Sequence, residues 1–118
     1  MNALEVLQKT RRLIDKPEYW VKGVFAQDAD WGEVQPTSPE ACSFCLLGAL
    51  SAACKGGPEA RRSRASYLVH RALDEFVADG EVVSIVAFND NPNTYHDDVL
   101  ACVDRAIQLA KEWEATCE

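Results

Sequence analysis

The segment that most constrains the fold of this chain runs from Ala41 to Cys54 and is apolar almost all the way round a helix. Ser38 and Pro39 precede it in the order typical of a helix start, with the serine as N-cap and the proline in the first turn. Glycines and a proline at 56–58 end it. A helix without a polar face has to be buried, so this pattern predicts a central helix that the rest of the chain surrounds.

Most of the remaining chain also has helical periodicity. Apolar residues recur at helical spacing in residues 2–14 and 59–79, and again in a long segment that begins near Thr94. Asp15 and Glu18 have the spacing of a capping box, which predicts a short helix that Gly23 closes. The run from Val82 to Phe88 is too short for its periodicity to distinguish strand from helix. We favour a buried irregular or helical segment there, since no second strand is evident.

These segments together predict an all-α fold, a compact single-domain bundle of about five helices that spans residues 1–118 and has one long loop. The helix at 59–79 should turn an apolar stripe inward and its arginines toward solvent. The residues predicted to face inward on this helix are Tyr67, Leu68, Ala72, Phe76 and Val77.

The composition is that of an ordinary globular domain. Hydrophobic residues make up 47% of the 118 residues and charged residues 26%. No apolar stretch approaches the roughly 18 residues needed to cross a bilayer, and the N-terminus lacks the pattern of a signal peptide. The chain has five cysteines, an odd number. We therefore expect free thiols in a cytoplasmic protein that does not bind membranes.

Residues 26–37 form the least regular stretch and are expected to be a loop, a length that is often functional in compact domains. Trp31 lies within it, and exposed tryptophans are enriched at binding hot spots. Asp28, Asp30 and Glu33 surround this tryptophan, but the later ligands of a calcium loop are missing. Trp31 is therefore a candidate for binding a partner, and no metal site is predicted.

A polar segment follows the apolar run that ends at Phe88. Seven of the nine residues from Asn89 to Asp97 are polar. Asparagine and aspartate side chains bond backbone amides one or two residues further on, so Asn89 and Asp90 are expected to form a rigid structural corner. Thr94 belongs to the same corner, and it is predicted to cap the last helix with Asp97 completing the box.

The pair Cys42 and Cys45 has the spacing of a zinc or redox motif, but a zinc site would need a second pair of ligands. A redox pair would need its first cysteine at a helix N-terminus after a strand, whereas Cys42 is expected about a turn inside the central helix. We therefore interpret both as small apolar residues of a buried helix. No cofactor is predicted.

An enzyme is the alternative to a purely structural role for these residues. A histidine can activate a thiol, and a carboxylate can orient the histidine. Cys45, His96 and Asp90 are the residues that would do this, with Asn89 in the same pocket. Nothing in the sequence shows that these groups meet, so no catalytic residue is assigned. A small enzyme or ligand-binding protein remains the second hypothesis.

Charge is divided unevenly along the chain. From Asp74 onward there are eleven acids and two bases, a net charge of −9, whereas the part before it has eight acids and ten bases, a net charge of +2. Such an asymmetry concerns partners rather than fold. Direct binding of nucleic acid is disfavoured by the total charge of −7. Asp97, Asp98 and Asp104 are the predicted acidic contacts to a partner.

Several short motifs resemble those of a family of small bacterial and phage proteins described only as a domain of unknown function. A tryptophan, an aspartate–glycine loop, a cysteine followed by a glycine–alanine pair, and an asparagine–aspartate pair occur in the family's order. Phenylalanine stands at Phe44 and Phe88, where tryptophan is expected in the family. The matching residues are Trp20, Asp30, Gly32, Cys45, Gly48, Ala49, Asn89 and Asp90.

The resemblance brings no activity, but it implies a prokaryotic or phage cytoplasmic setting, and phage proteins of this size often inhibit host machinery. With the acidic C-terminal part and the lack of a convergent catalytic set, it favours a non-catalytic protein-binding module. A phage-encoded inhibitor of a host nucleic-acid-handling complex, acting through an acidic surface, is the sharpest form of this hypothesis.

Overall fold

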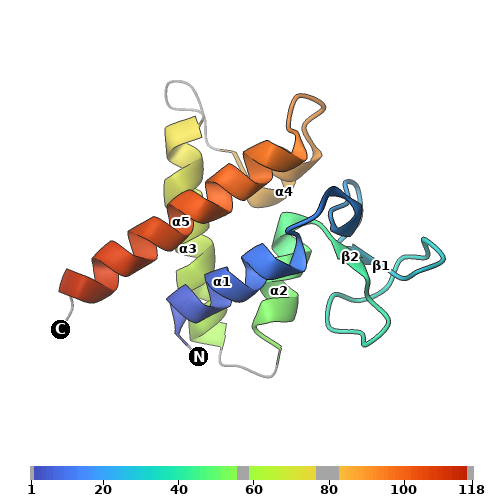
Figure 1. Ribbon diagram of the computed structural model, residues 1–118, viewed down its shortest axis with the longest axis horizontal. Coiled ribbons are helices and arrows are strands. Elements are labelled where there is room, and N and C mark those ends of the chain that lie inside the picture. Colours follow the sequence, from blue (N-terminus) through green and yellow to red (C-terminus); the bar gives the residue numbers. More distant parts are fainter. Residues whose placement is uncertain (1, 56–58, 77–82, 117–118) are drawn as a thin grey trace.

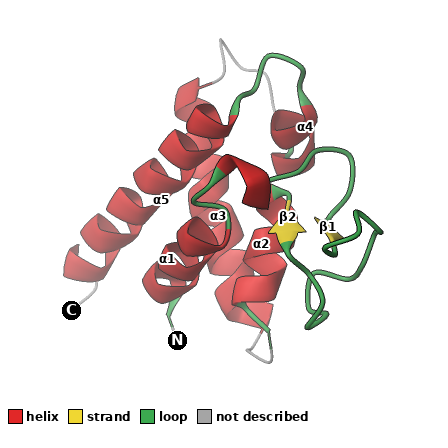
Figure 2. Ribbon diagram, turned by 45° about the vertical axis from the view of Figure 1, so that its right-hand side comes forward, coloured by secondary structure: helices red, strands yellow, loops and turns green. Residues whose placement is uncertain are grey.

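The computed structural model describes residues 2–55, 59–76 and 83–116, and helices dominate it (Figures 1 and 2). The predicted all-α class is confirmed, with one small pair of strands added. None of the described helices is both long enough and apolar enough to cross a membrane. The elements are α1 (Ala3–Leu13), a 3-10 turn η1 (Pro17–Tyr19), β1 (Ala26–Gln27), β2 (Ser43–Phe44), α2 (Leu46–Ala53), α3 (Glu59–Phe76), α4 (Ile85–Asp90) and α5 (His96–Thr116).

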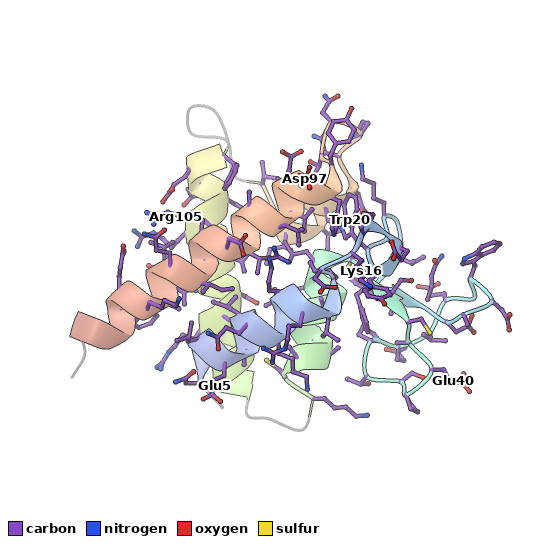
Figure 3. The ribbon with its side chains drawn as sticks, viewed as in Figure 1. Glu5, Lys16, Trp20, Glu40, Asp97 and Arg105 are labelled. Atoms are coloured by element: carbon purple, nitrogen blue, oxygen red, sulfur yellow. The ribbon has the colours of Figure 1, made fainter. Side chains whose placement is uncertain are left out.

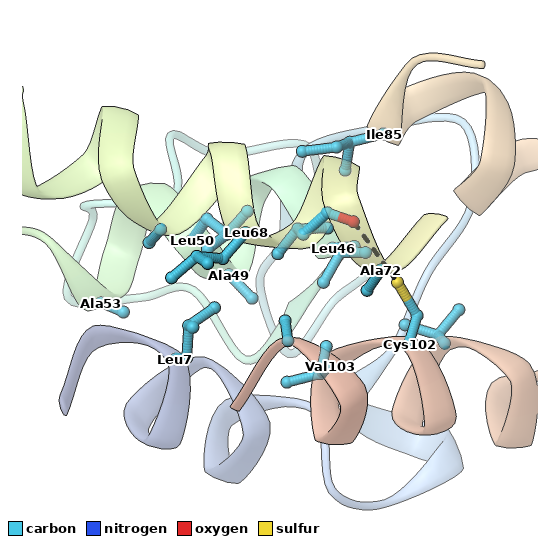
Figure 4. Packing of buried hydrophobic residues seen from close by; sticks show 14 of the residues in the cluster. Leu7, Leu46, Ala49, Leu50, Ala53, Leu68, Ala72, Ile85, Cys102 and Val103 are labelled. Atoms are coloured by element: carbon cyan, nitrogen blue, oxygen red, sulfur yellow. Dashed lines mark hydrogen bonds between the residues drawn. The ribbon is translucent and has the colours of Figure 1, made fainter. Parts of the chain in front are cut away.

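The core lies between α1, α2, α3 and α5, with α3 and α5 crossing one another (Figures 1 and 4). The central position predicted for the apolar segment is correct for its helical part, because Leu46, Ala49 and Leu50 of α2 are fully buried. Cys102 of α5 also faces this core. The largest fully buried apolar side chains are Leu7, Ile14, Leu46, Leu50, Leu73, Val6, Val69, Val99 and Val103.

The predicted start of the central helix at Ser38 is wrong, because α2 begins only at Leu46. Ser38 instead forms a turn, in which its carbonyl accepts from the Ala41 amide at 3.2 Å and its hydroxyl accepts from the Glu40 amide at 3.2 Å. Serine followed by proline suits such turns as well as helix starts. Cys42 consequently lies in the loop and is exposed, not a turn inside a helix.

Residues 43 and 44 form a strand where a helix was predicted. Phe44 pairs with Ala26 and Ser43 with Gln27 in an antiparallel ladder. On its other side, the Phe44 carbonyl accepts from the Val21 amide at 3.1 Å. The predicted loop at 26–37 therefore starts with two strand residues. Strand β2 joins the segments 20–21 and 26–27 to the start of α2.

The segment around Pro17 and helix α3 differ in detail from the predictions. The short helix expected from Asp15 to Gly23 is only the 3-10 turn η1. Helix α3 ends at Phe76, and Val77 lies outside the described residues. Leu68 and Ala72 face the core as predicted, whereas Tyr67 and Phe76 are 51% and 46% exposed.

The short segment before the polar corner is helical, as we favoured. Helix α4 begins at Ile85, and the Ser84 hydroxyl caps it by accepting from the Ala87 amide at 3.0 Å. Asn89 and Asp90 are the last two residues of α4 rather than the start of a corner. The capping box predicted for Thr94 and Asp97 is displaced by one residue: Asp98 accepts from the Tyr95 amide at 2.8 Å, and Thr94 is buried.

Gly48 lies where α2 meets the backbone of the preceding loop. A Cβ atom at this position would overlap the carbonyl oxygen of Phe25, which is backbone and cannot swing aside. That same carbonyl accepts from the Cys45 amide at 3.1 Å. Glycine is therefore required for the close approach of the loop to α2.

We predict that Gly48→Ala destabilises the protein by about 1–3 kcal/mol through overpacking and lowers Tm by several degrees. Thermal unfolding followed by circular dichroism measures the change. Ser51→Ala, at a half-buried position of the same helix, is the matched control and should leave Tm almost unchanged. An unaltered Tm for Gly48→Ala would contradict the close approach described here.

Candidate functional site

A buried amide connects three segments that are far apart in the sequence. The Asn89 side chain is completely buried. Its Oδ1 accepts from the Trp20 indole Nε1 at 2.6 Å and from the Leu46 amide at 3.0 Å. Its Nδ2 donates to the Val21 carbonyl and to Asp90 Oδ1, each at 3.0 Å. Both lone pairs and both N–H groups of the amide are thus used. We call Trp20, Val21, Leu46, Asn89 and Asp90 the Asn89 junction.

Asp90 extends the junction to the turn that follows Trp20. Its Oδ1 also accepts from the Gly23 amide at 3.0 Å. Gly23 has φ of +84°, a left-handed conformation that glycine adopts without strain. Nearby, Lys22 Nζ donates to the Asn91 carbonyl at 2.7 Å. The end of α4 therefore holds residues 20–23 through the backbone of Val21 and Gly23 and through the side chains of Trp20 and Lys22.

Cys45 lies beside this junction as the N-cap of α2. Its Sγ accepts from the Gly48 amide at 3.2 Å, and its side chain is 3% exposed. Burial raises the pKa of the Cys45 thiol, and the charge of Asp90 acts in the same direction, while bonds from the Gly48 and Leu47 amides oppose them. Since the thiolate is the nucleophilic form, this environment is unfavourable for a catalytic cysteine.

His96 contacts the junction through the ring of Trp20, with ring centroids 5.9 Å apart. Its Nε2 lies 2.6 Å from the carbonyl oxygen of Ile14, at the end of α1. Within the described part of the chain, no hydrogen bond joins His96 to Cys45 or to Asp90. The four residues considered for an enzyme thus lie in one region. Asn89 and Asp90 bond each other, whereas the polar groups of Cys45 and His96 contact only backbone atoms.

Trp31 lies in a tight loop that Asp28 organises. Asp28 Oδ1 accepts from the amides of Asp30 and Gly32, each at 2.9 Å. The Asp28 amide donates to the Gly32 carbonyl at 2.9 Å, and the Trp31 amide donates to the Asp28 carbonyl at 3.1 Å. Trp31 has φ of +65° and is 82% exposed. The backbone is fixed in a conformation unusual for a bulky residue, while the indole remains in solvent.

In this loop, one carboxylate oxygen of Asp28, Oδ1, is used by two backbone amides. Among the residues that the structure describes, no three histidine, cysteine, aspartate or glutamate side chains are grouped as a metal site would require.

The three acids predicted to contact a partner differ in what surrounds them. Asp98 bonds the Tyr95 amide, and Asp104 forms an ion pair with Arg11 of α1 at 2.9 Å. Asp97 is exposed on the outer side of α5 (Figure 3), with no hydrogen bond or ion pair to any described residue. Among the three, only the Asp97 side chain has no partner among the described residues, although its charge in the first turn of α5 favours the helix.

The fold and the junction define a small helical protein. It is built round the short buried helix α2 and the buried side-chain amide of Asn89, whose hydrogen-bonding positions are all used. The chain belongs to a family of unknown function, DUF6197, whose model matches residues 1–109. The expected membership of a family of unknown function is thereby confirmed. No curated protein and no solved structure shows significant similarity to the chain.

Sequence reasoning singled out Asn89 and Asp90 but missed their partners. Trp20 was singled out only by the family resemblance, and Leu46 was expected in the middle of a helix, where its amide would already be bonded. The organising role of Asp28 was missed as well, although an aspartate two residues before an aspartate and four before a glycine is a signal for such a loop.

We predict that Asn89→Ala leaves the Leu46 amide, the Trp20 indole and the Val21 carbonyl without their partner. Each buried group left unpaired costs about 1–3 kcal/mol, so urea unfolding should show a large loss of stability. Asn93→Ala, an exposed asparagine three residues beyond α4, is the control and should behave like the wild type. Equal stabilities of the two variants would refute the structural role of the junction.

We also predict that all five cysteines are reduced and that their reactivities differ. Denatured, non-reduced protein should show about five thiols on titration with a disulfide reagent, one for each cysteine in the chain. A titration that finds about one thiol would disprove this.

In native protein at pH 8, Cys42 should react fast, whereas Cys45 and Cys102 should be protected. Burial raises the pKa of Cys102 to about 12 and raises that of Cys45 too. Mass mapping of labelled peptides identifies the sites, and rapid labelling of Cys45 would favour an enzyme.

Proposed function

We propose that this protein is a non-catalytic binding module that contacts a protein partner through Trp31. The observation that supports this is the combination of 82% exposure with a fixed backbone of positive φ. Strained conformations of this kind occur preferentially at functional sites. An indole on a pre-organised loop loses little entropy when a partner covers it, and tryptophan is among the commonest hot-spot residues.

The loop around Trp31 carries one sign of charge. Between residues 26 and 40 there are four acids and no base. Asp30, Glu33 and Glu40 of this set are exposed. A partner surface that accepts the indole in an apolar pocket should therefore be basic around it. The nucleic-acid-binding surface of a host complex has this chemistry. We therefore favour a host nucleic-acid-handling complex as the partner, with this protein as its inhibitor.

The alternative of a small enzyme has less support. Asn89 has no unused hydrogen-bonding position, Asp90 holds two amide groups, and the Cys45 thiol is buried with a raised pKa. We therefore assign Asn89 and Asp90 a structural role, in which they support the region from which the Trp31 loop projects, and not a role as reacting groups.

The proposal is tested by photo-crosslinking in host lysate, with a benzophenone amino acid at position 31 and, as the control, at position 95. Tyr95 is also an exposed aromatic residue, at 69%. A product specific to position 31 that duplex DNA or raised salt prevents supports a basic protein partner. If positions 31 and 95 give the same products, or if Trp31→Ala protein competes as well as the wild type for the crosslinked partner, the proposal is refuted.

Asp97 offers a separate test of the acidic C-terminal part. Asp97→Lys should weaken binding to the crosslinked partner several-fold and flatten its salt dependence, because surface charges interact through screened attraction. Glu18→Lys, a reversal of an exposed acid in η1, is the control for net charge. Surface plasmon resonance at two salt concentrations measures both. Equal effects of the two reversals would show that α5 contributes net charge alone.

A further inference from the structure

A cleft of about 590 Å³ lies between α3 and α5, and neither Asp97 nor any residue of the Trp31 loop lines it. Figure 1 shows the C-terminal half of α5 extending beyond α3 after the two helices cross. The volume of the cleft falls in the range of about 300–1,000 Å³ that is typical of small-molecule pockets. We call it the α3–α5 cleft; its lining residues are Tyr67, Leu68, Arg71, Leu109, Glu112 and Trp113.

The walls of the cleft are aromatic and aliphatic. Tyr67 and Trp113 meet edge to face, with ring centroids 6.4 Å apart. Leu68 is buried and Leu109 half-buried. Tyr67 belongs to the stripe expected to be in the core, yet half of its surface is open to solvent. Tyr67 of α3 does not reach the core and therefore forms one side of the cleft.

Two guanidinium groups lie over these rings. Arg64 is 5.1 Å from the Trp113 centroid, and Arg71 is 6.0 Å from the Tyr67 centroid. One Arg71 N–H donates to the Tyr67 hydroxyl at 3.2 Å. A guanidinium has five donors, and neither arginine forms an ion pair within the described residues. Arg71 can therefore still receive an anion at the edge of an aromatic-lined space.

Glu112 limits the charge that such a ligand can carry. Its carboxylate lines the same cleft and would repel an anion of high charge. A single carboxylate or sulfonate can contact Arg71 while its ring lies against the apolar wall. A ligand with several phosphates fits this arrangement poorly.

We propose that the α3–α5 cleft binds a small aromatic molecule that carries one anionic group, with the ring against Tyr67, Leu109 and Trp113 and the anion on Arg71. None of these residues belongs to the Trp31 loop, so the proposal for the cleft and the proposal for the partner site can be refuted separately.

The test is a titration of the full-length protein, followed by ¹H–¹⁵N correlation spectra, with indole-3-acetate and with uncharged indole-3-acetamide. Shifts should concentrate at residues 67–71 and 109–113, and the acid should bind at least about tenfold more tightly than the amide, as one charge-assisted hydrogen bond provides. Shifts centred elsewhere, or equal affinities for acid and amide, overturn the proposal.

Variants assign the charge preference to particular residues. Arg71→Gln should remove the preference for the acid, whereas Arg12→Gln, at an exposed arginine on α1, should keep it. Glu112→Gln should strengthen binding of the acid and leave the amide unchanged. Arg71 is exposed, so its variant is expected to fold, and its spectrum without ligand verifies this. If Arg71→Gln protein retains the preference for the acid, Arg71 is not the anion site and the proposal fails.

Discussion

The arrangement of the largely non-helical segment between α1 and α2 depends on the hydrogen bonds of the buried Asn89 amide. This amide joins the end of α4 to the segment after η1 and to the first amide of α2, across 69 and 43 residues of sequence. A buried polar group that lost these partners would pay its full desolvation cost. The three segments are therefore stable only when they are assembled together, and no other polar contact in the described residues links as many.

The strands and the Trp31 loop are attached to this junction in sequence. Val21 bonds Asn89 through its carbonyl and Phe44 through its amide. The Phe25 carbonyl then receives the Cys45 amide, against the bare Cα of Gly48. These bonds continue into the β1–β2 ladder, from which the Trp31 loop projects. The exposed indole is thus connected to the core by consecutive backbone bonds rather than by a long free linker.

The sequence predicted the parts of this structure that depend on local pattern, and missed those that depend on distant partners. Apolar periodicity located α1, α3 and α5, and the all-apolar segment marked α2 as central. The same periodicity could not show that Ser43 and Phe44 pair with residues 26–27, because strand pairing is a long-range contact. The composition of the polar pair at 89–90 predicted a structural role for it. Its partners Trp20 and Leu46 could not be identified, since hydrogen bonds across 69 and 43 residues leave no local signal.

The choice of asparagine at position 89 follows from the groups around it, and it also locates where function can reside. An aspartate there would still accept from Trp20 and Leu46, but it could not donate to the Val21 carbonyl, and it would face Asp90 as a second carboxylate. Only an amide satisfies all four neighbours, which leaves the junction with no unused capacity. Groups that bind something else must have such capacity. The indole of Trp31, the carboxylate of Asp97 and the guanidinium of Arg71 have such capacity, and none of the three belongs to the junction.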